Sequence, residues 1–432
     1  MLDNNIIAIN EIAKLKAAGS SGGGSGTQFS KSISTIAQAK YNLTNLAFTS
    51  YPVTSGSQSY MRAFNHGSGQ FSIASIPFYN SGATQTQFYV QPFQVNQSTG
   101  AITSGSGNTI WTNGSGNCNS TNTWGQAGPY VFNTGNHCAP GNGGNIPITT
   151  VYTASGNSVS GTYSNHNTYQ PVLNENSLCT LNGGTAYWFP TVYSGNTGQA
   201  YHYVWSYDGG SLSNQQSSQI GSNTSTNYVI DVARQHGSAG VTGGGIRFFQ
   251  DSNGAGQIHI LSNTGGINTT ISQSSVQVGG EANQRANGFE LSNGTQIYYL
   301  QGGTVLLRNG NSLTNITTSA DYAPISSRQS MAATYTTPVS QNSWISFVDN
   351  GNSIYELVKF RINPTTYKIT IVGSTLLGNL TNNTGVANYG AYYLGAFITG
   401  STNQYIVTVG TSAYHANPSA FVIVGSNPLS GS

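Results

Sequence analysis

The sequence has few charged residues, and this shortage excludes several classes of protein. Only 6% of the 432 residues are Asp, Glu, Lys or Arg, and the formal net charge is +2. A chain with so little charge has no basic surface to hold nucleic acid and no acidic tail. It also lacks any run of 18 or more apolar residues, so no segment is predicted to span a membrane. We therefore expect neither nucleic-acid binding nor membrane insertion.

Cysteine is scarce too, and the residues that usually bind metals form no recognisable set. The three cysteines, Cys118, Cys138 and Cys179, lack the paired spacing of zinc motifs. Cys118 and Cys138 could form a disulfide that closes one long loop, with Cys179 unpaired. Three ordinary thiols are an alternative of equal weight. The seven histidines show no HExxH spacing, and GVTGGG (240–245) is not followed by the GK[ST] of a phosphate-binding loop. We expect no metal and no other cofactor.

Small polar residues and aromatic residues are abundant instead. The chain contains 55 Gly, 26 Tyr and 16 Phe. A Gly- and Ser-rich chain without aromatics could not bury enough surface to fold, so this aromatic content indicates a folded protein. Strand-forming residues alternate with turn-forming residues over most of the length, which predicts an all-β structure.

The N-terminal residues follow a different pattern. Residues 1–18 place apolar side chains at nearly helical spacing, with Asp3 as an N-cap candidate: Leu2, Ile6, Ile9, Ile12 and Leu15. Such a short helix is not stable alone in water. Residues 19–44 open with the flexible linker sequence GSSGGGSGT. We predict an anchor helix that docks the head, residues 45–432, to a larger assembly. A helix that packs on its own domain is an alternative of equal weight.

A hairpin pattern repeats after the linker. In each copy a polar residue follows a Gly-containing turn and opens a second strand; these residues are Gln87, Gln199, Gln257, Gln296, Ser353 and Gln404. From Gln199 they advance by 58, 39, 57 and 51 residues, and the 112-residue step before Gln199 leaves room for one more unit around 145–153. Such periods are typical of propeller blades. We predict a β-propeller of about seven four-stranded blades.

Two more observations support four strands per unit and a closed ring. PFQVNQSTGAIT (92–103) and KFRINPTTYKIT (359–370) align and occupy the same place in their units. The last unit offers only three strands, and NLAFTSYPVTS (45–55) could supply the fourth. Two β-sandwich domains are the alternative fold, and six or eight blades the alternative counts. The spacing places the blade starts near Ser59, Ala127, Ala186, Tyr228, Gly288, Ser330 and Ala391.

The carboxylates offer no clear catalytic pair. Glycoside hydrolysis needs two carboxyl groups that converge on one bond. No spacing among the eleven carboxylates indicates such a pair, although a propeller could bring three of them to its axis: Asp231, Asp321 and Glu281. SYDGG (206–210) is similar to the start of a sialidase Asp-box but lacks the Thr-Trp ending, and Asp-boxes are structural turns. We therefore expect that the protein is not an enzyme. His202 and His259 fall at the same place in aligned units, which favours a strand-face role over ligand binding.

The second unit contains a long insertion between Thr103 and Pro147. It carries two of the five tryptophans within a segment rich in Gly, Asn and Ser. Exposed rings form flat platforms for sugar faces, and neutral polar side chains bond to hydroxyls. The candidate receptor-binding residues are Trp111, Trp124, Tyr130 and His137. Burial of these rings as a local core is the alternative.

The blade pattern over residues 45–427 and the helix-and-linker layout resemble the propeller-headed receptor-binding proteins, spike or tail-fibre tips, of viruses that infect bacteria or archaea. No site residue is carried over. The resemblance implies a virion surface protein in multiple copies, whose N-terminal helix binds other virion subunits and whose head binds a host surface glycan or protein. The start of the sequence, which has no signal-peptide pattern, fits a protein released with the particle. The alternatives are a secreted microbial adhesin or lectin in processed or recombinant form, and a polysaccharide-degrading enzyme of the virion.

Overall fold

The computed structural model describes most residues from Tyr41 to Ser426. Residues 1–40 and 427–432 lie outside the described part, as do the connections 46–57, 80–85, 97–100, 114–121, 139–144, 166–177, 195–198, 223–228, 233–242, 251–254, 279–285, 301–303, 318–334, 350–353, 380–390, 400–402 and 412–418. The predicted anchor helix (1–18), most of the predicted linker and Cys118 therefore lie outside the described residues, and these predictions stay predictions.

The described strands form seven antiparallel sheets, which we number in chain order. Sheet 1 contains β2 (Gln58–Gly67), β3 (Gln70–Tyr79), β4 (Thr86–Val95), β5 (Ile102–Ser104) and β6 (Asn108–Asn113). Sheet 2 contains β7 (Asn122–Ala127), β8 (Tyr130–Cys138), β9 (Asn145–Ser155) and β10 (Ser158–Asn165). Sheet 3 contains β11 (Leu178–Asn182), β12 (Thr185–Phe189), β13 (Thr191–Ser194), β14 (Gln199–Tyr207) and β15 (Leu212–Ser222).

The remaining four sheets follow the same plan. Sheet 4 contains β16 (Val229–Val232), β17 (Gly245–Gln250), β18 (Gly256–Leu261) and β19 (Ile267–Ser272). Sheet 5 contains β20 (Ala286–Glu290), β21 (Gln296–Leu300), β22 (Val305–Asn309) and β23 (Ser312–Asn315). Sheet 6 contains β24 (Tyr335–Ser340), β25 (Ser343–Asp349), β26 (Ile354–Ile362) and β27 (Ile369–Asn379). Sheet 7 contains β28 (Ala391–Thr399), β29 (Asn403–Thr411), β30 (Ser419–Ser426) and β1 (Tyr41–Asn45).

Sheets 1 and 3 contain a fifth strand because one of their four strand positions is broken in two. β5 and β6 both pair with β4, so together they form the fourth strand of sheet 1. β12 and β13 both pair with β14, one on each side of Pro190, and form the second strand of sheet 3. Pro lacks the N–H that a ladder needs, which explains the break at this position.

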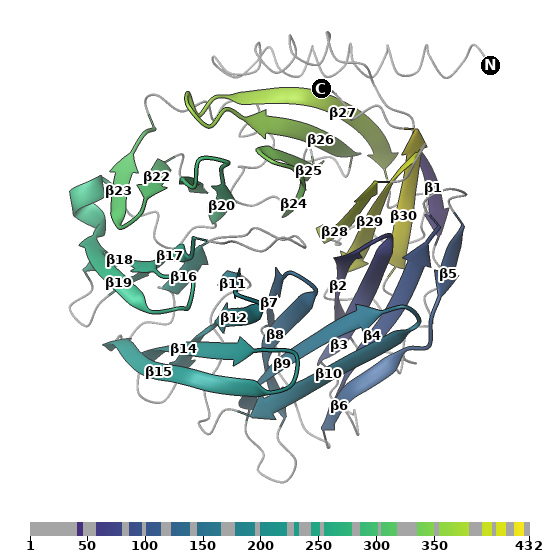
Figure 1. The fold of residues 1–432 in the computed structure, drawn as a ribbon, viewed down its shortest axis with the longest axis horizontal. Helices are drawn as coiled ribbons and strands as arrows, with labels where there is room; N and C mark the ends of the chain where they lie inside the picture. Colours follow the sequence, from purple (N-terminus) through teal and green to yellow (C-terminus); the bar gives the residue numbers. More distant parts are fainter. Residues whose placement is uncertain are drawn as a thin grey trace.

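The sheets are arranged as a ring (Figure 1). The innermost strands of the seven sheets are, in order, β2, β7, β11, β16, β20, β24 and β28. This arrangement is an all-β propeller, as the hairpin spacing predicted. Within the described ranges the only helix is η2 (Gln273–Val276), a single 3-10 turn after β19.

The ring closes by pairing the two ends of the chain. β1 pairs with β30 along five residues, from Tyr41 opposite Gly425 to Asn45 opposite Phe421. The prediction that a segment before the first unit completes the last sheet is therefore confirmed. The strand itself is 41–45 rather than the predicted 45–55. Most of the predicted segment falls in the connection 46–57, outside the described residues.

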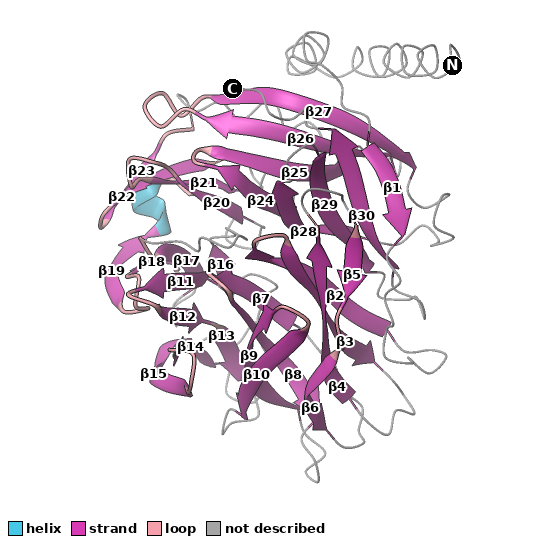
Figure 2. Ribbon diagram, turned by 45° about the vertical axis from the view of Figure 1, so that its right-hand side comes forward, coloured by secondary structure: helices cyan, strands magenta, loops and turns pink. Residues whose placement is uncertain are grey.

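One edge of the ring collects the tightest turns. In sheets 1 to 6 the first-to-second and third-to-fourth connections leave from the same end, because consecutive strands are antiparallel, and the first-to-second connection of sheet 7 does the same. We call this end the turn face. Most of its described connections are short, as Figure 2 shows, and several use a residue with positive φ, such as Gly128 (58°) and Asn342 (59°). Because Tyr41 lies opposite the end of β30, the chain also enters β1 from this face.

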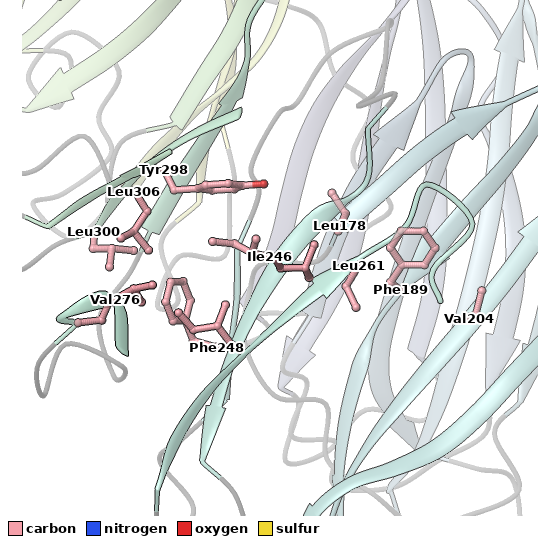
Figure 3. Close-up of a cluster of buried hydrophobic side chains, with 13 residues drawn as sticks. Leu178, Phe189, Val204, Ile246, Phe248, Leu261, Val276, Tyr298, Leu300 and Leu306 are labelled. Atoms are coloured by element: carbon pink, nitrogen blue, oxygen red, sulfur yellow. The ribbon is translucent and has the colours of Figure 1, made fainter. Parts of the chain in front are cut away.

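The hydrophobic core lies between neighbouring sheets rather than in one central mass. One large cluster takes Phe189 and Val204 from sheet 3, Ile246 and Phe248 from sheet 4, and Leu306 from sheet 5 (Figure 3). Alternating strand residues bury one face of each sheet against the next. The interface between sheets therefore decides both stability and the relative position of surface turns.

Candidate functional site

The two tryptophans of the predicted receptor-binding set are buried. Trp111 is 3% exposed on β6, and Trp124 is 1% exposed on β7. Both belong to one cluster between sheets 1 and 2, where Phe88 contacts each ring. The segment predicted as a loop insertion consists largely of strands β5 to β8, so its rings point into a core. Their burial corresponds to the packing alternative and removes them from the candidate surface.

The other predicted residues are placed differently. Tyr130 opens β8 on the turn face and is partly exposed. His137 lies in the same strand near its other end, and its side chain lies outside the described part of the structure, as does that of Cys138. Cys179, the leftover cysteine, is buried with a free thiol, and burial raises its pKa well above the ordinary value. Of the four predicted receptor-binding residues, Tyr130 is therefore the one whose side chain is described and partly exposed.

Buried arginines join neighbouring sheets through backbone carbonyls. Arg247 on β17 donates to the Phe189 carbonyl oxygen at 2.9 Å and to Nδ1 of His202 at 2.5 Å, both in sheet 3. His202 in turn donates from Nε2 to the Gly265 oxygen at 2.7 Å. Burial and the neighbouring Arg247 charge hold the pKa of His202 well below its usual value, and they lower that of His259 to about 3. Both histidines are therefore neutral structural groups, as their strand positions predicted.

A second arginine repeats this connection one sheet further on. Arg308 on β22 donates to the Leu261 oxygen at 3.0 Å and to the Gly245 oxygen at 3.2 Å, both in sheet 4. It also donates to Oε1 of Gln296 at 2.9 Å, and the Tyr298 hydroxyl bonds to the same oxygen. Each side chain is satisfied inside the protein, so this group stabilises the interface rather than offering a ligand site.

Sheets 1 and 2 are joined by a short hydrogen-bonded chain. His66 Nδ1 donates to the Pro129 oxygen at 3.0 Å, which leaves Nε2 to accept from the Ser72 hydroxyl at 2.7 Å. Ser72 accepts in turn from Tyr152 at 3.0 Å. Desolvation of the ring lowers the pKa of His66 to about 4. Ser72 is 0% exposed, so this Ser–His pair cannot act as a nucleophile on an external substrate.

Turns on the turn face also bond directly to one another. Asn342 in sheet 6 exchanges two hydrogen bonds with Ser292 in sheet 5, at 2.8 Å each. Asn293 donates to the Pro364 oxygen at 2.8 Å, again between sheets 5 and 6. Gln70 and the backbone of Gly156 form a similar pair between sheets 1 and 2. These bonds hold the exposed turns in fixed positions, so the polar groups on this face are preorganised.

One place on the turn face combines an accessible aromatic ring with an exposed carboxylate. Tyr130 of sheet 2 packs edge-to-face on Tyr207 of sheet 3, with ring centroids 5.1 Å apart and planes at 82°. Asp208 follows Tyr207 and is exposed. Its Oδ1 accepts from the Gly210 and Ser211 amides at 2.9 and 3.0 Å. We name this group, Tyr130, Tyr207 and Asp208, the Tyr130–Asp208 site.

The electrostatics of the site follow from this turn. The hydrogen bonds from the Ser211 and Gly210 amides hold the pKa of Asp208 below its usual value. Burial, together with Tyr130 and the Asp208 charge, raises the pKa of Tyr207. At neutral pH the site therefore carries one ionised acceptor beside the neutral phenol of Tyr207. The Tyr207 hydroxyl donates to the Gly209 oxygen at 3.1 Å, which fixes its ring under the turn.

Glycine keeps this site open. A Cβ at Gly209 would lie 3.2 Å from the Tyr130 hydroxyl oxygen, and one at Gly210 would lie 3.5 Å from Oδ1 of Asp208. Side chains at these positions would cover the groups that a ligand would contact. The sequence marked SYDGG as a structural turn and Tyr130 as a candidate, but it held no sign that they adjoin across two sheets.

Neither a metal cluster nor a membrane helix occurs within the described ranges. None of their His, Cys, Asp or Glu side chains gather in a group of three or more that could hold a metal ion. None of the helices in this part of the chain is long and apolar enough to cross a membrane.

Comparisons with known proteins give only distant likenesses to solved structures. No protein-family model and no curated protein matches the chain. Among solved structures, the Aleuria aurantia lectin is 13% identical with a TM-score of 0.35, over 73% of this chain and 95% of the lectin. The Trypanosoma rangeli sialidase is 9% identical with a TM-score of 0.34, over 83% and 70%. The S. cerevisiae core factor is 8% identical with a TM-score of 0.45, over 93% of this chain but 64% of the core factor chain.

Proposed function

We propose that this chain is the recognition head of a virion, a ring of seven blades whose turn face binds a glycan on the host cell. The Tyr130–Asp208 site carries the proposal. The Tyr130 ring packs on Tyr207 across the boundary between sheets 2 and 3, and the ionised Asp208 follows Tyr207 in a turn closed by two amide hydrogen bonds. Recognition tends to concentrate in surface turns on a rigid scaffold, because their residues can change without disturbing the core.

The composition fits this role. With only 6% charged residues, the surface offers hydroxyl and amide groups that bond to neutral ligands without long-range attraction to ions. The predicted anchor, residues 1–18, would bind other virion subunits and present several heads per particle. The last residues of the predicted linker, 19–44, belong to β1 (Tyr41–Asn45), and the chain enters this strand from the turn face. A flexible Gly/Ser segment allows the head to turn that face outward.

The experiment compares binding and assembly in one set of particles. Purified full-length chain should bind host cells, and a chain lacking residues 1–20 should bind them equally well but fail to join particles. A secreted adhesin would bind cells and never copurify with virions. A polysaccharide-degrading enzyme would release new reducing ends from host envelope polysaccharide. Absence of cell binding by the full-length chain would contradict the proposal.

A further inference from the structure

The Tyr130–Asp208 site combines two features that select one kind of ligand. Asp208 is ionised at neutral pH, so its carboxylate only accepts hydrogen bonds. Two backbone amides occupy Oδ1, and a carboxylate has about four acceptor positions in all. Capacity therefore remains for donors from outside the protein. Tyr130 adds a partly exposed aromatic surface whose ring is held by Tyr207.

From this pairing we infer that the Tyr130–Asp208 site binds a neutral saccharide ring, with two adjacent hydroxyls donating to Asp208 and the C–H face of the sugar on Tyr130. This inference rests on the proposed function and deepens it by narrowing the ligand class to neutral saccharides and by assigning each residue its contact. A pyranose ring has one apolar face and a rim of hydroxyl donors, so it satisfies both groups at once. Sialic acids, uronic acids and sulfated or phosphorylated sugars bring a negative charge toward Asp208 and are disfavoured.

The chain itself supplies the variant that separates binding from turn structure. In the turn after β26, Asn363 Oδ1 accepts from the Thr365 and Thr366 amides at 2.8 and 2.9 Å, the same pattern that Asp208 makes. An amide oxygen therefore supports this kind of turn. Asp208→Asn should leave the fold intact while it removes the charge and replaces an acceptor with a donor.

The matched control for the aromatic ring is Tyr163. It is 45% exposed on β10, the outer strand of sheet 2, and it is the only large apolar side chain exposed to that degree among the described residues. Tyr163→Ala removes an exposed tyrosine from the same sheet without touching the turn face. Tyr130→Ala removes the ring of the site.

The test measures binding of the full chain to immobilised neutral polysaccharides and to sialylated and uronate-containing ones. We expect saturable binding to at least one neutral polysaccharide, at least tenfold weaker binding for Tyr130→Ala and Asp208→Asn, and no change for Tyr163→Ala. Melting temperature and circular dichroism of each variant show that the fold is kept. Because the ligand is neutral, binding should change little between 0.05 and 0.5 M NaCl.

The outcomes distinguish the inference from the proposed function. If the wild-type chain binds host cells and both site variants bind equally well, the site is wrong while the function stands. Preference for acidic polysaccharides, or binding that salt abolishes, would contradict the ligand class and point to a charged partner. If the wild-type chain binds no host cells but binds neutral polysaccharide through Tyr130, the virion role fails and the saccharide site survives.

Discussion

Arg247 donates to Nδ1 of His202 at 2.5 Å across the boundary between sheets 3 and 4. Both side chains are almost fully buried, at 1% and 0% exposure. An imidazole nitrogen and a backbone carbonyl both accept hydrogen bonds from the Arg247 guanidinium. The interface is therefore held by groups whose partners cannot be changed singly without leaving another polar atom unsatisfied.

Arg247→Met tests this relationship. It leaves His202 Nδ1 and the Phe189 oxygen without their donor, and each buried unsatisfied group costs about 1–3 kcal/mol. We expect the free energy of unfolding to fall by about 3 kcal/mol, measured by urea denaturation. Arg361→Met is the control, because Arg361 is exposed and should change stability by less than about 0.5 kcal/mol. Equal stability of the two variants would contradict the role of Arg247.

The two buried tryptophans should respond differently to the same substitution. Trp111 donates from Nε1 to the Thr150 hydroxyl at 2.8 Å, whereas Trp124 Nε1 has no hydrogen-bond partner within the described part of the chain. Trp111→Phe loses both volume and a hydrogen bond, and Trp124→Phe loses volume only. We expect Trp111→Phe to cost about 1 kcal/mol more. Thermal unfolding of both variants gives the comparison.

Truncation to alanine at either tryptophan should be far more damaging. A buried Trp→Ala change costs about 3–5 kcal/mol. Binding to polysaccharide, measured below the melting temperature of each variant, should stay close to the wild-type value because both rings are buried. A variant that keeps its stability and loses binding would reverse this interpretation.

Acid should destabilise the protein below about pH 6.5. The pKa of His66 is lowered to about 4 and that of His259 to about 3, from an ordinary value of 6.5. Above pH 6.5 both are neutral whether the chain is folded or unfolded. Between pH 6.5 and the folded pKa the unfolded chain binds more protons than the folded chain. The free energy of unfolding therefore decreases by about 1.4 kcal/mol for each unit by which the pH is lowered, for each histidine.

The measurement is the melting temperature from pH 8 to pH 4.5. It should stay nearly constant to about pH 6.5 and fall steeply below. His66→Gln should make that fall shallower, since one fewer group takes up a proton on unfolding. An unchanged slope would mean that His66 does not carry the lowered pKa.

Removal of β1 should open the ring. A chain that begins at residue 41 keeps all five residue pairs with β30, and one that begins at residue 46 keeps none of them. The chain that begins at residue 46 exposes the edge of β30, whose unpaired backbone groups can pair with a strand of another molecule. We expect the first to remain monodisperse with a wild-type melting temperature, and the second to melt earlier and aggregate. Size-exclusion chromatography with light scattering measures the difference; two equally well-behaved chains would contradict the closure role.

The sequence predicted the propeller because its hairpins repeat, but it could not assign each hairpin to a strand pair. Gln199 and Gln257 lie at the start of third strands, whereas Gln296 and Gln404 lie at the start of second strands. Any two consecutive strands are antiparallel, so both hairpins of a sheet use the same turn chemistry. The short step of 39 residues from Gln257 to Gln296 comes from this change of strand position.

A break within a strand explains why the sequence prediction differs from the structure around Trp111. The fourth strand of sheet 1 is interrupted between β5 and β6, where a Cβ at Gly107 would lie 1.8 Å from the Tyr89 hydroxyl oxygen. Glycine is required there by a side chain distant in sequence, and a local pattern cannot show such a contact. The sequence pattern therefore placed Trp111 in a loop. The Tyr130–Asp208 site was missed for the same reason, because its parts come from two sheets.

The pairing of β1 with β30 also determines how the protein responds to mechanical force. A pull through the residues before β1 enters at Tyr41, opposite Gly425. Beyond Asn45 the chain continues into sheet 1, so tension reaches the remaining sheets through the backbone only after the five residue pairs have separated. Pulling along the strand shears these pairs together, while pulling across it separates them one at a time. A head held by its N-terminal segment on one side and by a ligand on the other would yield first at this junction.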